Sequence, residues 1–171
     1  PLTVVEERTV GPDLGSDAIQ KGMRTALAGF GLVVAFMMLL YGRWGLVANL
    51  ALGLNVILTF AVLSIIPGAT LTLPGIAGLV LTVGMAVDTN VLIFERIREE
   101  LRNGRSIRQA VELGYDRAFR TVFDAHSTAI ISGLFLFQFG TGPIKGFAVT
   151  LITGLVANLF TAVLFTRMIY D

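Results

Sequence analysis

Residues 71–100 have the sequence LTLPGIAGLVLTVGMAVDTNVLIFERIREE, in which a long apolar run carries one charged side chain, Asp88, before a strongly charged end. A helix needs about 20 mostly apolar residues to cross about 30 Å of hydrocarbon. The stretch therefore predicts a membrane-spanning helix over residues 71–94. Because residues 95–100 contain five charges, we expect the helix to leave the hydrocarbon there and to end at Asn103-Gly104, a typical helix terminator.

The rest of the chain repeats this pattern of long uncharged runs between isolated charges. Of its 171 residues, 54% are hydrophobic and only 15% are charged, which is unusual for a water-soluble domain. The sequence predicts an all-α membrane protein with five transmembrane helices. The predicted spans are residues 22–40, 45–66, 71–94, 124–139 and 146–166.

Two further segments are predicted outside the hydrocarbon. Residues 1–20 are interpreted as the end of a periplasmic domain and a linker, because residues 2–10 have the β-branched composition of a strand. The transmembrane domain then covers residues 21–171. Its segment 105–122 has the apolar spacing of an amphipathic cytoplasmic helix, which we expect to be broken at Gly114. Since the chain lacks an initiator Met and a leader, we interpret it as a fragment of a longer protein.

The distribution of arginine predicts the orientation, because Arg and Lys concentrate in cytoplasmic loops. The loop after the third span is rich in arginine and is predicted to be cytoplasmic. Alternating the spans from this loop makes the N-terminus of the fragment periplasmic and its C-terminus cytoplasmic. The arginines of the loop are residues 96, 98, 102, 105, 108, 117 and 120.

Charge and composition exclude several classes of function. The net charge of +1 gives no electrostatic support for nucleic-acid binding. The chain has no cysteine and a single histidine, His126, so no thiolate or zinc site is expected. The sequence predicts no metal and no organic cofactor.

Asp88 is the candidate functional residue, because it is the one acid buried within a predicted span. At about 1.5 Å per residue it lies about 10 Å inward from Glu95. An ionised carboxylate there costs several kcal/mol unless it is paired, hydrated or protonated. A carboxylate that is protonated and deprotonated in turn suits a proton-coupled machine. The alternative is an aspartate neutralised by a fixed arginine or by hydrogen bonds between packed helices.

Polar residues on neighbouring spans extend this candidate site. Asp124, Thr128 and Ser132 recur every four residues on the fourth span, and the fifth span has a similar face. The predicted proton pathway is Asp88, Asn90, Asp124 and Thr128. Two alternatives stay open for the polar faces, which are a water-lined path and close helix packing through small residues. The residues of the fifth-span face are Thr150, Gly154, Ala157 or Asn158, and Thr161, and Asn49 and Asn55 on the second span are ambiguous in the same way.

The cytoplasmic end of the fourth span is also ambiguous. Asp124 and His126 could pass protons there, but a carboxylate at a membrane edge is more often a hydrated helix cap. A role for His126 as a pH sensor is not favoured for the same reason.

Four motifs closely resemble the SecD branch of the SecD/SecF family, and together they cover nearly the whole chain. Residues 84–100, GMAVDTNVLIFERIREE, form the longest and most specific of them. Thr89 stands where the family pattern has Ala, which we expect to be a conservative change. The other motifs are residues 11–15 (GPDLG), 72–78 (TLPGIAG) and 140–148 (GTGPIKGFA).

The resemblance implies a subunit of the bacterial inner membrane, related to the resistance-nodulation-division (RND) superfamily and built on a six-helix repeat. The chain would supply helices two to six. The family uses the proton-motive force to promote protein export, and the acid of its motif maps onto Asp88. Its charged partners would come largely from SecF, because no basic residue inside the five spans can neutralise Asp88. The implied partners are SecF, the SecYEG channel, SecA, preproteins, YajC, YidC and the lipid bilayer.

Two other functions are alternatives to this one. A proton-driven small-molecule exporter of the RND type would use the same fold, but the short outer turns and the family motif disfavour it. An intramembrane aspartyl protease needs two carboxylates close together within the membrane. Asp116 lies in the arginine-rich segment and Asp124 lies near an interface, so no such pair is available. The sequence therefore predicts a transport component without enzymatic activity.

Overall fold

The structure is a computed structural model that describes residues 12–66 and 72–162, and these residues form five helices. All five are long and apolar enough to cross a membrane, which confirms the predicted set of long apolar helices. The predicted strand at residues 2–10, the turn at Pro67-Gly68 and the end of the fifth predicted span lie outside the described residues. The helices are α1 (Pro12–Tyr41), α2 (Arg43–Ile65), α3 (Leu73–Arg102), α4 (Ile107–Phe139) and α5 (Pro143–Phe160).

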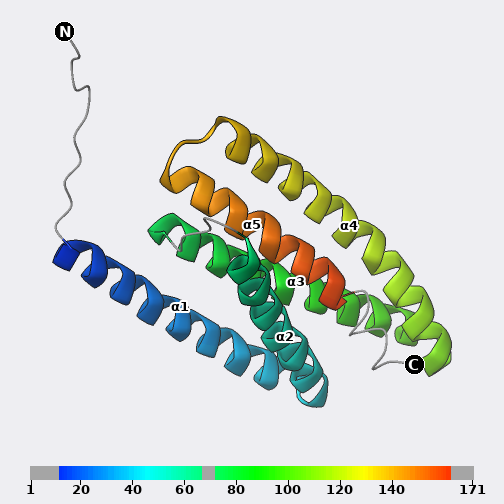
Figure 1. Cartoon of the computed structure of the whole chain (residues 1–171). Helices are drawn as coiled ribbons and strands as arrows, with labels where there is room; N and C mark the ends of the chain where they lie inside the picture. Colours follow the sequence, from blue (N-terminus) through cyan, green and yellow to red (C-terminus); the bar gives the residue numbers. More distant parts are fainter. Residues whose placement is uncertain (1–11, 67–71, 163–171) are drawn as a thin grey trace, which may run out of the picture.

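The helix that carries Asp88 is at the centre of the bundle. Helix α3 contacts each of the other four helices, and α5 packs beside it while contacting α2 and α4 as well. Helix α4 runs along one edge of the bundle, α1 lies at the opposite edge and α2 crosses between them (Figure 1). This arrangement buries one side of α3 against α4 and α5, and it determines which side chains of α3 are left uncovered.

The first two helices are joined by a single residue, Gly42, whose φ of 53° lies in the left-handed region that favours glycine. Helix α1 starts at Pro12, so the last residues of the predicted linker and the first predicted span form one continuous helix. At its other end the Tyr41 hydroxyl donates a hydrogen bond to Glu95 of α3 over 3.3 Å. The turn after α1 therefore lies at the same end of the bundle as the charged end of α3.

Helices α3 and α4 begin with side-chain caps that the sequence provides. The Thr72 hydroxyl accepts a hydrogen bond from the Gly75 N–H over 3.2 Å at the start of α3. At the start of α4 the Ser106 hydroxyl accepts one from the Gln109 N–H over 3.4 Å. Both caps satisfy backbone donors that the first turn of a helix leaves unpaired.

The predicted break at Gly114 is wrong, because α4 is one helix from Ile107 to Phe139. Gly114 is instead a point of close approach between α4 and α3. A Cβ atom added to Gly114 would lie 2.7 Å from the backbone nitrogen of Ile97 and 2.8 Å from its Cα atom. Ile93, Ile97, Ala110 and Ala118 form a buried cluster around this contact. The absent side chain allows close packing of two helices and does not interrupt either of them.

We predict that Gly114→Ala destabilises the protein by about 1–3 kcal/mol, because the methyl group would overlap the α3 backbone, which cannot move aside cheaply. The measurement is the thermal denaturation midpoint of the full-length protein in detergent. Gly53→Ala is the matched control, since a Cβ atom at this helical glycine meets nothing within 4 Å. Alanine should leave that midpoint unchanged or raise it slightly. Equal effects of the two substitutions would contradict the close approach.

Candidate functional site

Asp88 lies on a face of α3 that no helix of the described chain covers. The side chain is exposed in the described chain, and it lies within a helix that is long and apolar enough to cross a membrane. Ala77, Leu81 and Gly84 are exposed on the same side, at helical spacings of three and four residues. We call these four residues the Asp88 face.

The Asp88 face is shaped for close contact with another helix. A Cβ atom added to Gly84 meets nothing within 4 Å, so the helix surface is open one turn before the carboxylate. Small residues such as Ala77 and Gly84 let two helix backbones approach closely in a membrane. Since the described helices leave Asp88 uncovered, a group that contacts its carboxylate directly would come from water, lipid or another protein segment.

The other three residues of the predicted pathway are not gathered around Asp88 on one face. Asn90 follows Asp88 by two residues, which is about 200° around a helix, and it is buried in the bundle. Asp124 and Thr128 are exposed on α4, where the Thr128 hydroxyl donates to the Asp124 carbonyl over 2.9 Å. The Ser132 hydroxyl donates to the Thr128 carbonyl over 3.0 Å in the same way. The hydroxyl groups of this stripe thus bond to their own helix.

A buried hydrogen-bond chain joins α3, α4 and α5 directly behind Asp88. Its members are Thr89, His126 and Asn158, and each is at most 3% exposed. The Asn158 side-chain nitrogen lies 3.2 Å from the Thr89 hydroxyl oxygen and 2.6 Å from Nε2 of His126. The neighbouring Asp88 carboxylate acts electrostatically on the His126 ring. We call this chain the Thr89–Asn158–His126 bridge.

The hydrogen bonds of the bridge determine the state of the histidine. The Thr89 hydroxyl donates to the Met85 carbonyl over 2.8 Å, so its oxygen accepts from the Asn158 amide N–H₂ group. The second N–H of that group then donates to Nε2 of His126. Nδ1 of the ring lies 2.9 Å from the Val122 carbonyl, which can only accept. The network therefore assigns His126 as the neutral tautomer with its proton on Nδ1.

Sequence reasoning missed this bridge. His126 was placed at the membrane edge and given no favoured role, whereas it is one of the most buried polar residues of the described chain. Thr89 was expected to be a conservative change from Ala, but its hydroxyl provides a partner that a methyl group cannot. The available signal was the polar pair Thr89-Asn90 beside Asp88, together with Asn158 on the polar face of α5.

The two asparagines of α2, Asn49 and Asn55, lie at contacts within the bundle. The Asn49 side chain donates a hydrogen bond to the Val34 carbonyl over 3.2 Å and so ties α2 to α1. Asn55 is 1% exposed, and its side-chain nitrogen has no hydrogen-bond partner within residues 12–66 and 72–162. Neither residue has a hydrogen bond to the Thr89–Asn158–His126 bridge in this part of the chain.

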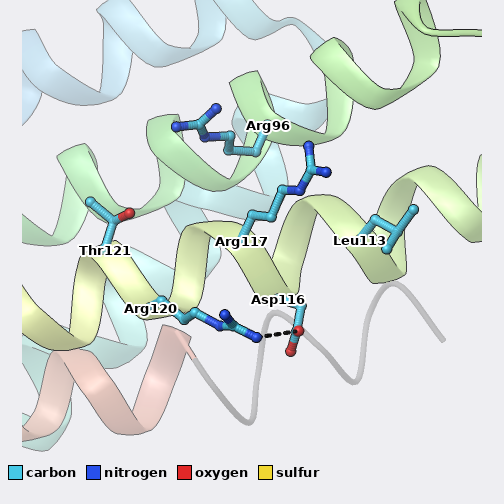
Figure 2. A pocket seen from close by; sticks show the side chains of 6 residues that line it. All are labelled: Arg96, Leu113, Asp116, Arg117, Arg120 and Thr121. Atoms are coloured by element: carbon cyan, nitrogen blue, oxygen red, sulfur yellow. Dashed lines mark ion pairs between the residues drawn. The ribbon is translucent and has the colours of Figure 1, made fainter.

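The arginine-rich ends of α3 and α4 form a groove with a volume of about 470 Å³. Figure 2 shows Arg96 of α3 and Arg117 and Arg120 of α4 at this groove. Each guanidinium is paired within the chain: Arg96 with Glu99 over 2.8 Å, Arg120 with Asp116 over 3.7 Å, and Arg117 with Glu100. These pairs neutralise much of the positive charge, so we assign no anion site to the groove.

One known protein family matches nearly the whole chain, including the central helix α3 that carries Asp88. The model of the family described as "Protein export membrane protein SecD/SecF, C-terminal" matches residues 2–170. The chain belongs to the SecD/SecF family. The five-helix bundle is therefore that of a family of protein export membrane proteins.

Individual SecD/SecF family members are similar over the whole chain. The protein translocase subunit SecD of Anaeromyxobacter dehalogenans is 60% identical over 100% of this chain, which covers 28% of that relative. The SecD subunit of Desulfurispirillum indicum is 58% identical over 100% of this chain and 33% of its own length. The chain thus spans about a third or less of these relatives.

A solved structure of the SecD/SecF family has the same fold. The crystal structure of SecDF from Thermus thermophilus, titled a translocon-associated membrane protein, superposes with a TM-score of 0.88 and 48% sequence identity. The match covers 94% of this chain and 22% of that chain.

Proposed function

We propose that the chain is the membrane region of a subunit that promotes protein export across the bacterial inner membrane with the proton-motive force. Asp88 is the proton-carrying group in this proposal. Protons are its coupling ion, and it needs no organic cofactor or metal.

The observation that carries the proposal is the position of Asp88 at membrane depth on an uncovered helix face. Isolated acids within transmembrane helices are costly and usually functional. A carboxylate that a second segment can approach and leave experiences two environments, and its proton affinity differs between them. A permanently buried, permanently paired aspartate would lack this property.

The proposed partner on the Asp88 face is the homologous membrane subunit SecF, which would supply a cation to Asp88. The wider set of proposed partners is SecYEG, SecA, preproteins, YajC and YidC. The test of the function is removal of the titratable group at Asp88 in the full-length protein, and it is described in the Discussion.

The orientation of the bundle has a separate test, because proton movement has a direction. The positive-inside rule predicts that the hairpin between α3 and α4 is cytoplasmic. In a cysteine-free full-length protein, Glu112→Cys should react with a membrane-impermeant thiol reagent only after the cells are opened. Ile144→Cys, at the opposite end of the bundle, should react in intact spheroplasts. Labelling of Glu112→Cys from the periplasmic side would contradict the orientation.

A further inference from the structure

Protonation of His126 would change the hydrogen bonding of the Thr89–Asn158–His126 bridge. With a proton on Nε2, the ring would present a donor to the Asn158 N–H₂ group, and two donors 2.6 Å apart have no acceptor between them. A buried donor left unpaired costs about 1–3 kcal/mol. The bridge cannot keep its present form when the histidine is charged.

The bridge nevertheless has a second arrangement in which its polar groups are paired. If the Asn158 amide turns over, its oxygen can accept from Nε2–H of His126. The same oxygen can accept from the Thr89 hydroxyl, provided that the hydroxyl proton turns away from the Met85 carbonyl, 2.8 Å away. One proton taken up from water at Nε2 of His126 on α4 thereby turns the hydroxyl group of Thr89, the residue next to Asp88 on α3.

The charged groups around His126 make Asp88 its relevant neighbour. On α3 the carboxylate of Asp88 acts on the ring, whereas Glu95 begins the charged end of that helix. The charged residue within α5 is Lys145, thirteen positions before Asn158 and so about 20 Å away along the helix. On α4, Asp124 is exposed and points about 200° away from His126. Helix α2, which packs on α5, carries Arg43 at its first residue.

We propose that His126 is a second protonatable group of this site and a positioning residue for Asp88. Its charged form supplies a cation from within the chain, and the amide of Asn158 transmits its state to Thr89. The proposal rests on the proposed function of Asp88 and revises the expectation that a counter-charge must come from outside the five spans.

The direct test is the ring ¹⁵N NMR signal of His126 in the full-length protein in lipid vesicles. Its assignment comes from the signal that is lost in His126→Gln. We expect the Nδ1-protonated neutral form at high pH and a transition to the charged form as the pH is lowered. The Asn158 side-chain amide signals should change with the same midpoint, and this midpoint should move in Asp88→Asn. A ring that stays neutral throughout, or one that titrates without a response of Asn158, would overturn the proposal.

The functional test compares His126→Gln with Thr82→Val. Gln can place an acceptor oxygen near the position of Nε2 but does not titrate. Thr82→Val removes a buried hydroxyl of α3 that donates to the Leu79 carbonyl of its own helix, so it controls for general loosening of the contact between α3 and α5. We expect proton-driven export to change about fivefold or more between about pH 5 and about pH 8 in the wild type and in Thr82→Val, and less than about twofold in His126→Gln. A wild-type pH profile in His126→Gln would refute the role.

The function proposed for Asp88 and the role proposed for His126 can be refuted separately. Full proton-driven export by Asp88→Asn would refute the function proposed for Asp88. The titration of His126 and the response of Asn158 are measured without export, so they keep their meaning whichever result the Asp88 variant gives.

Discussion

Asp88→Asn in the full-length protein is expected to lower proton-driven stimulation of export at least about tenfold, to the level measured without a proton-motive force. Asparagine keeps the size of the side chain and its capacity for hydrogen bonds, but it cannot bind or release a proton. The measurement is the translocation of a preprotein into inverted membrane vesicles, with and without an imposed proton gradient. Assembly is checked by copurification with the partner subunit, which we expect to be unchanged.

Asp116→Asn is the matched control for Asp88→Asn. It removes a carboxylate with the same change of atoms, but its side chain is 75% exposed and its partner Arg120 lies 3.7 Å away on the surface of α4. Solvent screens such a pair, so we expect stimulation to stay within about twofold of the wild type. If Asp88→Asn vesicles respond to the gradient as the control does, Asp88 is not the proton carrier.

Arg117→Ala is expected to destabilise the hairpin of α3 and α4 by about 2–3 kcal/mol. The substitution removes the closer of the two cations beside the Glu100 carboxylate, whose side chain is only 3% exposed. Breaking a fully buried ion pair costs about 3–5 kcal/mol. The value is smaller in this case because the Arg117 side chain is 58% exposed and Arg105 remains 4.0 Å from Glu100. The measurement is the thermal denaturation of the full-length protein in detergent.

Arg120→Ala gives a matched control on the same helix. Both members of the Arg120–Asp116 pair are well exposed, so the loss should stay below about 0.5 kcal/mol. Adding Glu100→Gln to Arg117→Ala should restore part of the stability, because a neutral amide is cheaper to bury than an unpaired carboxylate. Equal losses in Arg117→Ala and Arg120→Ala would show that the Glu100 pair does not hold the hairpin.

The positions of the long apolar helices along the chain followed from the sequence for a simple reason. Crossing hydrocarbon requires about 20 uncharged residues with their backbone hydrogen bonds satisfied internally, and few other structures meet that requirement. The long runs between Arg24, Arg43, Asp88 and Lys145 therefore predicted the helices from charge spacing alone. One helix end followed in the same way, because α3 ends at Arg102, directly before the predicted terminator Asn103-Gly104.

Local reasoning failed where a residue responds to a neighbouring helix. Gly114 was interpreted as a helix breaker from its intrinsic propensity, which is a penalty of only about 1 kcal/mol. Contact with the backbone at Ile97 outweighs that penalty and explains why the glycine stands in an unbroken helix. The burial of His126 was missed for a similar reason, because it comes from α3 and α5 and not from its own segment.

The sequence by itself determined that this chain has five long apolar helices, an arginine-rich segment after the third of them and one acid within an apolar run. These properties depend on the order of apolar and charged residues, and that order is local. Tertiary structure alone decided that Asp88 points away from its own bundle while Thr89 points into it, toward Asn158 and His126. Adjacent residues on a helix point about 100° apart, so which of them meets a neighbour depends on how α3 is rotated against α4 and α5.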